Sequence, residues 1–152
     1  MSEGVLVRRM EAADVEAVSR IEAECFSQPW SAAAYRDALA DEKYLYLCAE
    51  AEGQIVGMCG MLQILDEGDI SNVAVTEHMR GKGIAGSMLA ELLARGAERG
   101  IRDFTLEVRV SNLAAIRLYE SHGFRSEGIR PGFYEEPRED AMIMWRRTSN
   151  YH

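Results

Sequence analysis

Apolar residues recur along the chain with two different periods, which separate predicted strands from predicted helices. A period of two, or a short apolar run between turn residues, predicts strands over residues 5–8, 44–50, 55–65, 70–75, 104–110, 124–129 and 141–146. Helical spacing predicts helices over residues 12–25 and 31–40, a third that runs to about Arg99 and a fourth that ends at Gly123. Helices and strands therefore alternate in only part of the chain.

The segment from Phe104 to Val110 has the clearest strand pattern. Its apolar positions are Phe104, Leu106, Val108 and Val110, and its polar positions are Thr105, Glu107 and Arg109. Successive side chains of a strand point to opposite faces of the sheet. We therefore expect one buried face and a polar face that carries Glu107.

Turn and cap residues predict the connections. Glu52-Gly53-Gln54 predicts one turn and Asp66 to Asp69 the next. Ser31 is a suitable N-cap for the second helix, and Ser111-Asn112 can cap the fourth. Pro131, Gly132, Tyr134 and Pro137 predict a long loop between the last two strands.

The order of elements predicts the fold class. One strand, two helices, three strands, a helix, a strand, a helix and two strands indicate a mixed α/β (α+β) sheet with one or two parallel crossovers. The chain has 152 residues and neither repeats nor a linker, so we expect a single domain over residues 1–152.

Composition excludes several classes of protein. Hydrophobic residues make up 47% and charged residues 28%, which is typical of a globular protein. No apolar run approaches the roughly 18 residues of a membrane span, and the N-terminal segment does not resemble a signal peptide. We therefore expect a cytoplasmic protein with no membrane partner. The three cysteines and three histidines have no metal-ligand spacing, so no metal site is predicted.

The formal net charge of −8 bears on possible partners. It argues against direct nucleic-acid binding, which depends on neutralising phosphates. A negative field attracts a cationic partner, although solubility alone also accounts for such a charge.

A predicted strand ending in Val73-Ala74-Val75 is followed by the glycine-rich run Arg80 to Ala85 and then by a helix. Glycines at a helix N-terminus let several backbone N–H groups approach an anion closely. The pattern indicates a phosphate-binding loop, with an ordinary turn before a helix as the alternative.

Two other phosphate-binding motifs fit this loop poorly. Gly81, Gly83 and Gly86 spell the dinucleotide fingerprint GxGxxG, but five residues separate the strand from the first glycine, where the fingerprint needs a tight turn. A nucleoside-triphosphate loop would need a Lys-Ser/Thr pair after the glycines, and the chain has none there.

A second group of residues can carry acid–base chemistry. Glu107 lies on the polar side of its strand, and Asn112 and Tyr119 are two helical turns apart on one face of the following helix. If that helix packs beside the strand, a carboxylate, an amide and a phenol come together. The alternative is a solvent-facing glutamate and a core tyrosine.

The run from Val73 to Ala85 and the string LEVRVSN…LY of residues 106–119 resemble the acetyl-CoA-binding core of the Gcn5-related N-acetyltransferases (GNAT). With residues 25–31 and 138–144, the second string resembles the ribosomal-protein-alanine N-acetyltransferases within that superfamily. The resemblance covers nearly the whole chain. It implies a central, mostly antiparallel sheet with a splayed parallel pair, flanked by helices.

The resemblance also implies roles for individual residues. The implied acetyl-CoA-binding residues are Val73, Ala74, Val75, Arg80, Gly81, Lys82, Gly83, Ile84, Ala85 and Asn112. Glu107 would be the general base and Tyr119 the general acid, while Pro29 and Trp30, in the loop with Gln28, and Tyr134 would line the acceptor site.

The implied acceptor is the N-terminal amine, alanine above all, of a small-subunit ribosomal protein or another protein. The alternatives are a lysine side chain, a small-molecule amine, or a non-catalytic acetyl-CoA-binding module. The pair Glu107 and Tyr119 argues against the module, and the loop with Pro29 and Trp30 favours a peptide end.

Overall fold

The computed structural model describes residues 4–26 and 29–148, and the strands in these ranges form one sheet in the order β1-β2-β3-β4-β5-β7-β6. The strands are β1 (Val5–Arg9), β2 (Tyr44–Ala51), β3 (Gln54–Ile64), β4 (Glu67–Val75), β5 (Asp103–Arg109), β6 (Arg125–Glu135) and β7 (Arg138–Arg147). The helices are α1 (Val15–Cys25), α2 (Ala32–Leu39), α3 (Ile84–Glu98) and α4 (Leu113–Ser121), with the 3₁₀ helices η1 (Ala12–Asp14) and η2 (Glu77–Met79). The predicted mixed α/β class is confirmed.

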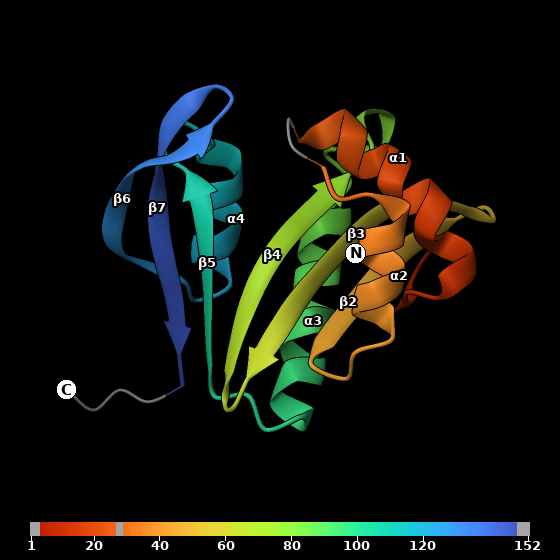
Figure 1. Cartoon of the computed structure of the whole chain (residues 1–152), viewed down its shortest axis with the longest axis horizontal. Coiled ribbons are helices and arrows are strands. Elements are labelled where there is room, and N and C mark those ends of the chain that lie inside the picture. The colour runs from red at the N-terminus through yellow and green to blue at the C-terminus, as the bar shows by residue number, and fades with distance from the viewer. Residues whose placement is uncertain (1–3, 27–28, 149–152) are drawn as a thin grey trace.

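Strands β4 and β5 form a parallel pair, whereas the other neighbouring strands are antiparallel. The parallel register covers Glu67–Ile70 against Asp103–Leu106. Beyond it both strands continue, and they diverge toward their C-terminal ends (Figure 1). The expected splayed pair is therefore present, and we call the opening between its ends the β4–β5 gap.

The helices cover both faces of the sheet. Side chains of α3 and α4, such as Leu89 and Ile116, share one core with Phe104 of β5. Side chains of α1 and α2, such as Val18 and Tyr35, share a second core with the opposite side of β2, β3 and β4. We call the two sides the α3/α4 face and the α1/α2 face. Within the described ranges, no helix is long and apolar enough to cross a membrane.

Two helices begin at side chains that the sequence predicts as caps. The Ser31 hydroxyl accepts a hydrogen bond from the N–H of Ala34 at 3.1 Å, at the start of α2. The Asn112 Oδ1 atom accepts one from the N–H of Ala115 at 3.2 Å, at the start of α4. Each cap satisfies an N–H group that has no partner inside its helix.

The final hairpin contradicts the predicted long loop. β6 and β7 pair up to a two-residue turn at Glu136-Pro137, so Tyr134 lies in a strand. The register shifts between Arg130 and Tyr134, and Pro131 falls in this irregular stretch. A proline is tolerated at a bulge because a bulged residue need not donate to the ladder. The turn-forming residues therefore mark an irregular strand.

Strand β4 begins at Glu67, where the sequence predicts a turn. The actual turn has two residues, with Leu65 at a φ of 57°. Glu67 pairs with Ile64 of β3 on one side and with Asp103 of β5 on the other. Pairing with two neighbours outweighs the local turn preference of Asp and Gly. As a result, Asp69 is a strand residue.

Replacing Gly60 with alanine tests how Tyr46 packs over the sheet. A Cβ atom at Gly60 would lie 2.0 Å from the ring of Tyr46, which is 2% exposed. We expect Gly60→Ala to lower the free energy of unfolding by about 1–3 kcal/mol, the usual cost of overpacking, in urea denaturation. In the matched control Gly128→Ala, an added Cβ meets nothing within 4 Å, so the change should stay within about 0.5 kcal/mol. Equal effects of the two variants would contradict this packing.

Candidate active site

An apolar pocket of about 470 Å³ lies beside the diverging end of β4, between the start of α3 and α4. We call it the β4–α4 pocket. Its lining is Val73, Val75, Met79, Arg80, Gly81, Gly83, Ile84, Ala85, Gly86, Ala114, Ala115, Leu118 and Tyr119. The structure thus brings Tyr119 together with seven of the predicted coenzyme-binding residues.

Two glycines shape the entrance to α3. Gly81 and Gly83 have φ angles of 77° and 79°, in the left-handed region that favours glycine. Ser87 is the first residue of α3 whose N–H reaches a backbone carbonyl, that of Gly83 at 3.1 Å. Within the described chain, the N–H groups of Ile84 and Gly86 therefore have no backbone partner, and the helix dipole adds positive potential. This arrangement suits an anion such as a phosphate group.

The edge of β4 at the β4–β5 gap carries backbone groups that β5 does not pair. The N–H of Thr76 bonds to the carbonyl of Val56 in β3 at 2.8 Å. Because backbone polar groups alternate in direction along a strand, those of Val73 and Val75 point to the gap. An extended chain with amide groups could pair with Val73 there, as a further strand would.

The Arg80 guanidinium fastens the end of β4 to α1. It donates to the Val75 carbonyl at 3.0 Å and to the Cys25 sulfur at 3.3 Å, and it lies 4.0 Å from the Glu24 carboxylate. Glu24 also accepts from the Thr76 hydroxyl at 3.0 Å. We call this group the Arg80 clasp. Although Arg80 lines the β4–α4 pocket, its side chain is already bonded to protein groups.

Tyr119 lines the β4–α4 pocket from α4 and is 8% exposed. Its ring packs edge-on against Phe124, with 5.8 Å between the ring centroids. Its hydroxyl has no hydrogen-bond partner in the part of the chain that the structure describes. Burial raises the pKa of the phenol above its ordinary value of 10.0. At neutral pH Tyr119 is therefore a protonated donor with no partner beside the pocket.

Glu107 lies on the opposite face of the sheet from α4. As predicted, its neighbours Leu106 and Val108 are buried against the α3/α4 face, which places the half-buried Glu107 on the α1/α2 face. Its carboxylate forms no hydrogen bond or ion pair with any described residue. Glu107 and Tyr119 thus come from opposite faces of the sheet, and no hydrogen bond between described residues joins them.

Tyr134 shares the α1/α2 face with Glu107. The Arg109 guanidinium lies 4.3 Å from the centre of the Tyr134 ring and donates to Glu139 at 3.2 Å. Burial, and then the charge of Glu107, raise the pKa of Tyr134 to about 12. The two predicted site residues, Glu107 and Tyr134, are therefore electrostatic neighbours.

Trp30 is held by an aromatic cluster and a buried carboxylate. The centre of its ring lies 5.3 Å from that of Tyr35, 6.3 Å from Tyr44 and 6.0 Å from Tyr46. Its backbone N–H donates to the carboxylate of Glu22, which is 1% exposed. Pro29 beside it is exposed, and Gln28 lies outside the described residues.

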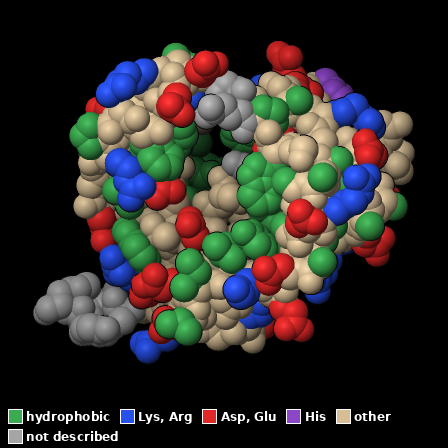
Figure 2. All heavy atoms as spheres, viewed as in Figure 1, with side chains coloured by type: hydrophobic (Ala, Val, Ile, Leu, Met, Phe, Trp, Pro, Cys, Tyr) green, Lys and Arg blue, Asp and Glu red, His purple; other side chains and the backbone are tan. Residues whose placement is uncertain are grey.

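Glu22 was not predicted as a site residue. It lies four residues after Val18 and seven after Val15, on the apolar stripe of α1, and both of those residues are fully buried. A carboxylate on a buried stripe needs hydrogen-bond donors, and this signal could have identified Glu22 as a buried acceptor, though not the Trp30 backbone as its donor. Figure 2 shows that the molecular surface is hollowed between the α1 end and the β6–β7 end. We call this hollow the cleft.

Three predicted coenzyme-binding residues do not line the β4–α4 pocket. Ala74 alternates with its pocket-lining neighbours, so it is buried in the α1/α2 core. Lys82 lines a different cavity. Asn112 is exposed and uses its Oδ1 atom to cap α4.

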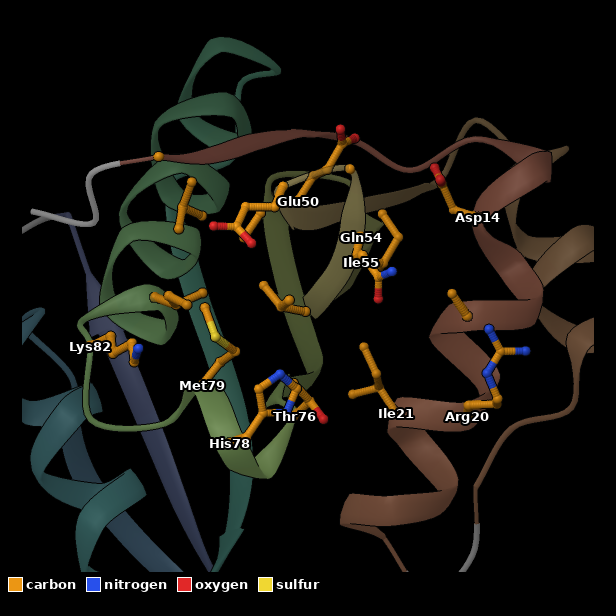
Figure 3. A pocket seen from close by; sticks show the side chains of 18 of the residues that line it. Asp14, Arg20, Ile21, Glu50, Gln54, Ile55, Thr76, His78, Met79 and Lys82 are labelled. Carbon is orange, nitrogen blue, oxygen red and sulfur yellow. The ribbon is translucent and has the colours of Figure 1, made fainter.

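That second cavity is larger, at about 1270 Å³, and lies between β1, α1 and the turn from β2 to β3 (Figure 3). Arg20, His78 and Lys82 border it, and so do Asp14 and Glu50. None of the predicted catalytic residues lines it, and its mixture of opposite charges favours no class of ligand. The smaller β4–α4 pocket and the cleft are therefore the candidate active site.

A sequence model of the acetyltransferase (GNAT) family matches residues 15–124, which is more than half of the chain. The class of protein is thus an acetyl-CoA-dependent N-acetyltransferase. The chain belongs to the GNAT acetyltransferase family.

Individual relatives and solved structures are similar to this chain over most of its length. The [ribosomal protein bS18]-alanine N-acetyltransferase of Escherichia coli K12 is 34% identical over 140 residues, which cover 91% of this chain and 94% of that protein. A crystal structure of the ribosomal-protein-S18-alanine N-acetyltransferase from Escherichia coli has a TM-score of 0.87 and 32% identity, over 97% of this chain and 96% of that one. A chain of the NatC complex bound to Gag peptide and CoA has the same fold, with a TM-score of 0.82 and 21% identity over 95% and 99% of the two chains.

The substitution Gly83→Asp tests the entrance to α3. It adds negative charge and a side chain where φ is 79°, so we expect coenzyme A to bind at least about tenfold more weakly in calorimetry, a loss of roughly 1.4 kcal/mol. The matched control is Gly53→Asp, because Gly53 has a φ of 77° but lies in the turn from β2 to β3. Equal losses in both variants would assign the effect to strain or net charge instead of the loop.

Proposed function

We propose that the protein transfers the acetyl group of acetyl-CoA to the N-terminal amine of a protein, alanine above all, with a small-subunit ribosomal protein as the acceptor. One observation carries the proposal. The anion-binding entrance of α3 and Tyr119 lie on one side of the β4–β5 gap, and the unpaired carboxylate of Glu107 lies on the other. The named activity of the Escherichia coli relative supports this acceptor, and an acceptor of this kind supports a cytoplasmic location for the enzyme.

The residues of the β4–α4 pocket fit coenzyme A as the acyl carrier. A pyrophosphate would accept hydrogen bonds from the N–H groups of Ile84 and Gly86, and the pantetheine arm would pair with the backbone of Val73 along the gap. The apolar lining suits the rest of that arm. When bound, acetyl-CoA supplies the acetyl group as a thioester. The fold shared with a chain of the NatC complex, which is bound to Gag peptide and CoA, agrees with this fit.

The cleft fits a peptide end better than a buried small molecule. It is open to solvent in Figure 2, and Trp30 and Tyr134, the acceptor residues that the family resemblance implies, would provide aromatic surfaces. An α-amino group has an ordinary pKa near 7.7–8.0 against about 10.4 for lysine. Removing its proton at neutral pH therefore costs roughly 3 kcal/mol less, at about 1.4 kcal/mol per pKa unit.

In this proposal Glu107 accepts a proton from the amine and Tyr119 donates one to the leaving group. Glu107 takes a proton from the amine, directly or through a water molecule, as the amine attacks the thioester carbonyl. Tyr119 stabilises the departing sulfur by donating from its hydroxyl, and solvent returns the proton to the phenol afterwards. Its raised pKa keeps it protonated in the free enzyme, so the donor is always available. The cysteines need no covalent role.

The acceptor can be tested with acetyl-CoA and short peptides that differ at residue one, read by mass spectrometry. We expect peptides with a free N-terminal alanine to gain one acetyl group, because the α-amine is the more easily deprotonated nucleophile. The matched controls are the same peptides with a blocked N-terminus and an internal lysine. Faster acetylation of the blocked lysine peptides would reject the N-terminal acceptor in favour of a lysine acetyltransferase.

The two catalytic roles predict different pH–rate profiles. Tyr119→Phe removes only the donor and should lower kcat by about 10²–10⁴-fold at every pH. Glu107→Gln should cause a similar loss at pH 7 that partly recovers above about pH 8, where solvent supplies the neutral amine. Tyr35→Phe is the matched control. The buried Tyr35 hydroxyl has no hydrogen-bond partner among the described residues, so the change should leave kcat within about twofold.

Thermal melts of these variants separate catalysis from packing. If Glu107 and Tyr119 were only packing residues, the variants would lose stability and their rates would depend on pH as in the wild type. Full activity of Tyr119→Phe with an unchanged profile would reject its role as the acid.

A further inference from the structure

Asp69 is a carboxylate of the α1/α2 face that the mechanism above does not use. It lies in β4 opposite Thr105 of β5, near the end of the parallel register. It is half-buried, and it forms no hydrogen bond or ion pair with any residue in the described ranges. A half-buried carboxylate without a partner costs stability, so it requires an explanation.

The parallel pairing places Asp69 and Glu107 on the same face. Side chains at paired positions of neighbouring strands point the same way, so Asp69 shares a face with Thr105, and Glu107 follows Thr105 by two residues. The strands part beyond Ile70 and Leu106, directly next to both carboxylates. Two unpaired carboxylates therefore flank the start of the β4–β5 gap on the cleft side.

The electrostatics of Asp69 agree with this placement. Burial, and then the charge of Glu107, raise its pKa to about 6, and Arg130 of β6 opposes the rise. On the other side, the phenol of Tyr46 in β2 lies close enough for the Asp69 charge to act on it. Arg130 is the one cation that acts appreciably on Asp69 among the described residues, and it does not form an ion pair with it.

Two facing carboxylates without bound donors match a cation that has several N–H groups. An ammonium group offers three donors at tetrahedral angles and one positive charge, and it can bond to both carboxylates at once. A carboxylate end or a phosphate would be repelled at the same place. The protein's own residues leave these acceptor positions open on the side of the gap where the proposed amine arrives.

We propose that Asp69 is a specificity-determining residue that binds the α-ammonium group of the acceptor together with Glu107. The inference rests on the proposed function. One N–H bond of the ammonium breaks as its proton passes to Glu107, and the neutral amine stays hydrogen-bonded to Asp69 with its lone pair free to attack. Asp69 therefore acts mainly on acceptor binding, and Glu107 on the chemical step.

The test compares the full chain with Asp69→Asn in steady-state assays, using saturating acetyl-CoA and a peptide with a free N-terminal alanine. Asp69→Asn should raise KM for the peptide about tenfold or more, change kcat by a smaller factor, and leave KM for acetyl-CoA unchanged. Asp69→Glu should recover part of the peptide affinity. The matched control is Asp66→Asn, since Asp66 is an exposed acid in the turn before β4 and should leave all three constants within about twofold.

A stability readout distinguishes this role from a structural one. Because the pKa of Asp69 is raised in the folded protein from 3.8 to about 6, its ionisation destabilises the fold as the pH rises through that range. Asp69→Asn should therefore raise Tm at pH 7.5, and the gain should shrink as the pH falls to 4.5. A structural carboxylate would give the opposite sign at pH 7.5.

The outcomes separate the inference from the proposed function. If the wild type acetylates the alanine peptide and Asp69→Asn has the same peptide KM, or a lower Tm at pH 7.5, the inference alone fails. If the wild type acetylates no peptide with a free amine, the proposed function fails and the inference fails with it.

Discussion

Strands β4 and β5 share hydrogen bonds over four residue pairs and then separate. Each strand continues beyond that point with its other neighbour, β4 with β3 and β5 with β7. The separation leaves backbone polar groups of β4 without a partner strand, and such groups are costly unless something else pairs with them. It also makes an opening between the two faces of an otherwise continuous sheet. The β4–α4 pocket lies on one side of this opening and Glu107 on the other.

Contacts from outside the sheet hold the end of β4 that borders the gap. The Arg80 clasp bonds the carbonyl of Val75 and connects it to α1 through Cys25 and Glu24. The same residue is predicted to contact pyrophosphate, and its bonds show a second use, in which it fixes the strand whose edge would carry the pantetheine arm. Removal of such a cation would affect β4 and the entrance of α3 together. For that reason we expect the position of the strand and the binding of an anion to be coupled in this protein.

The sequence alone predicted the features that depend on neighbouring residues, such as strand alternation and helix caps. The alternation from Phe104 to Arg109 gave the correct buried face, and Ser31 and Asn112 cap the predicted helices. Prediction from the sequence was wrong for the stretch around Tyr134, because pairing with β7 extends β6 through residues that favour turns. Asp69 fell within a predicted turn for the same reason, since β3 and β5 both pair with the start of β4.

The remaining site features depend on contacts between segments that are far apart in the chain. Glu22 and Trp30 meet through a bend whose geometry no local pattern specifies, and the aromatic partners of Trp30 come from α2 and β2. The resemblance to a known family supplied Trp30 and Tyr134 as acceptor residues. The resemblance did not identify the residues that hold Trp30 in place, such as Glu22 and Tyr35, because these contacts depend on how distant segments pack.

The two sides of the gap differ in the electrostatic groups that they present. A protein with a net charge of −8 repels a polyanion over long distances, so a phosphate group must be held by short-range donors. The N–H groups at the start of α3 provide these on the α3/α4 face, where Tyr119 adds an uncharged donor. On the α1/α2 face, the carboxylate of Glu107 would add to a negative field that attracts the ammonium group of the proposed acceptor. The sheet lies between the two regions. In the proposed function, the overall negative charge would therefore oppose acetyl-CoA and favour a cationic acceptor, and the two would meet at the gap.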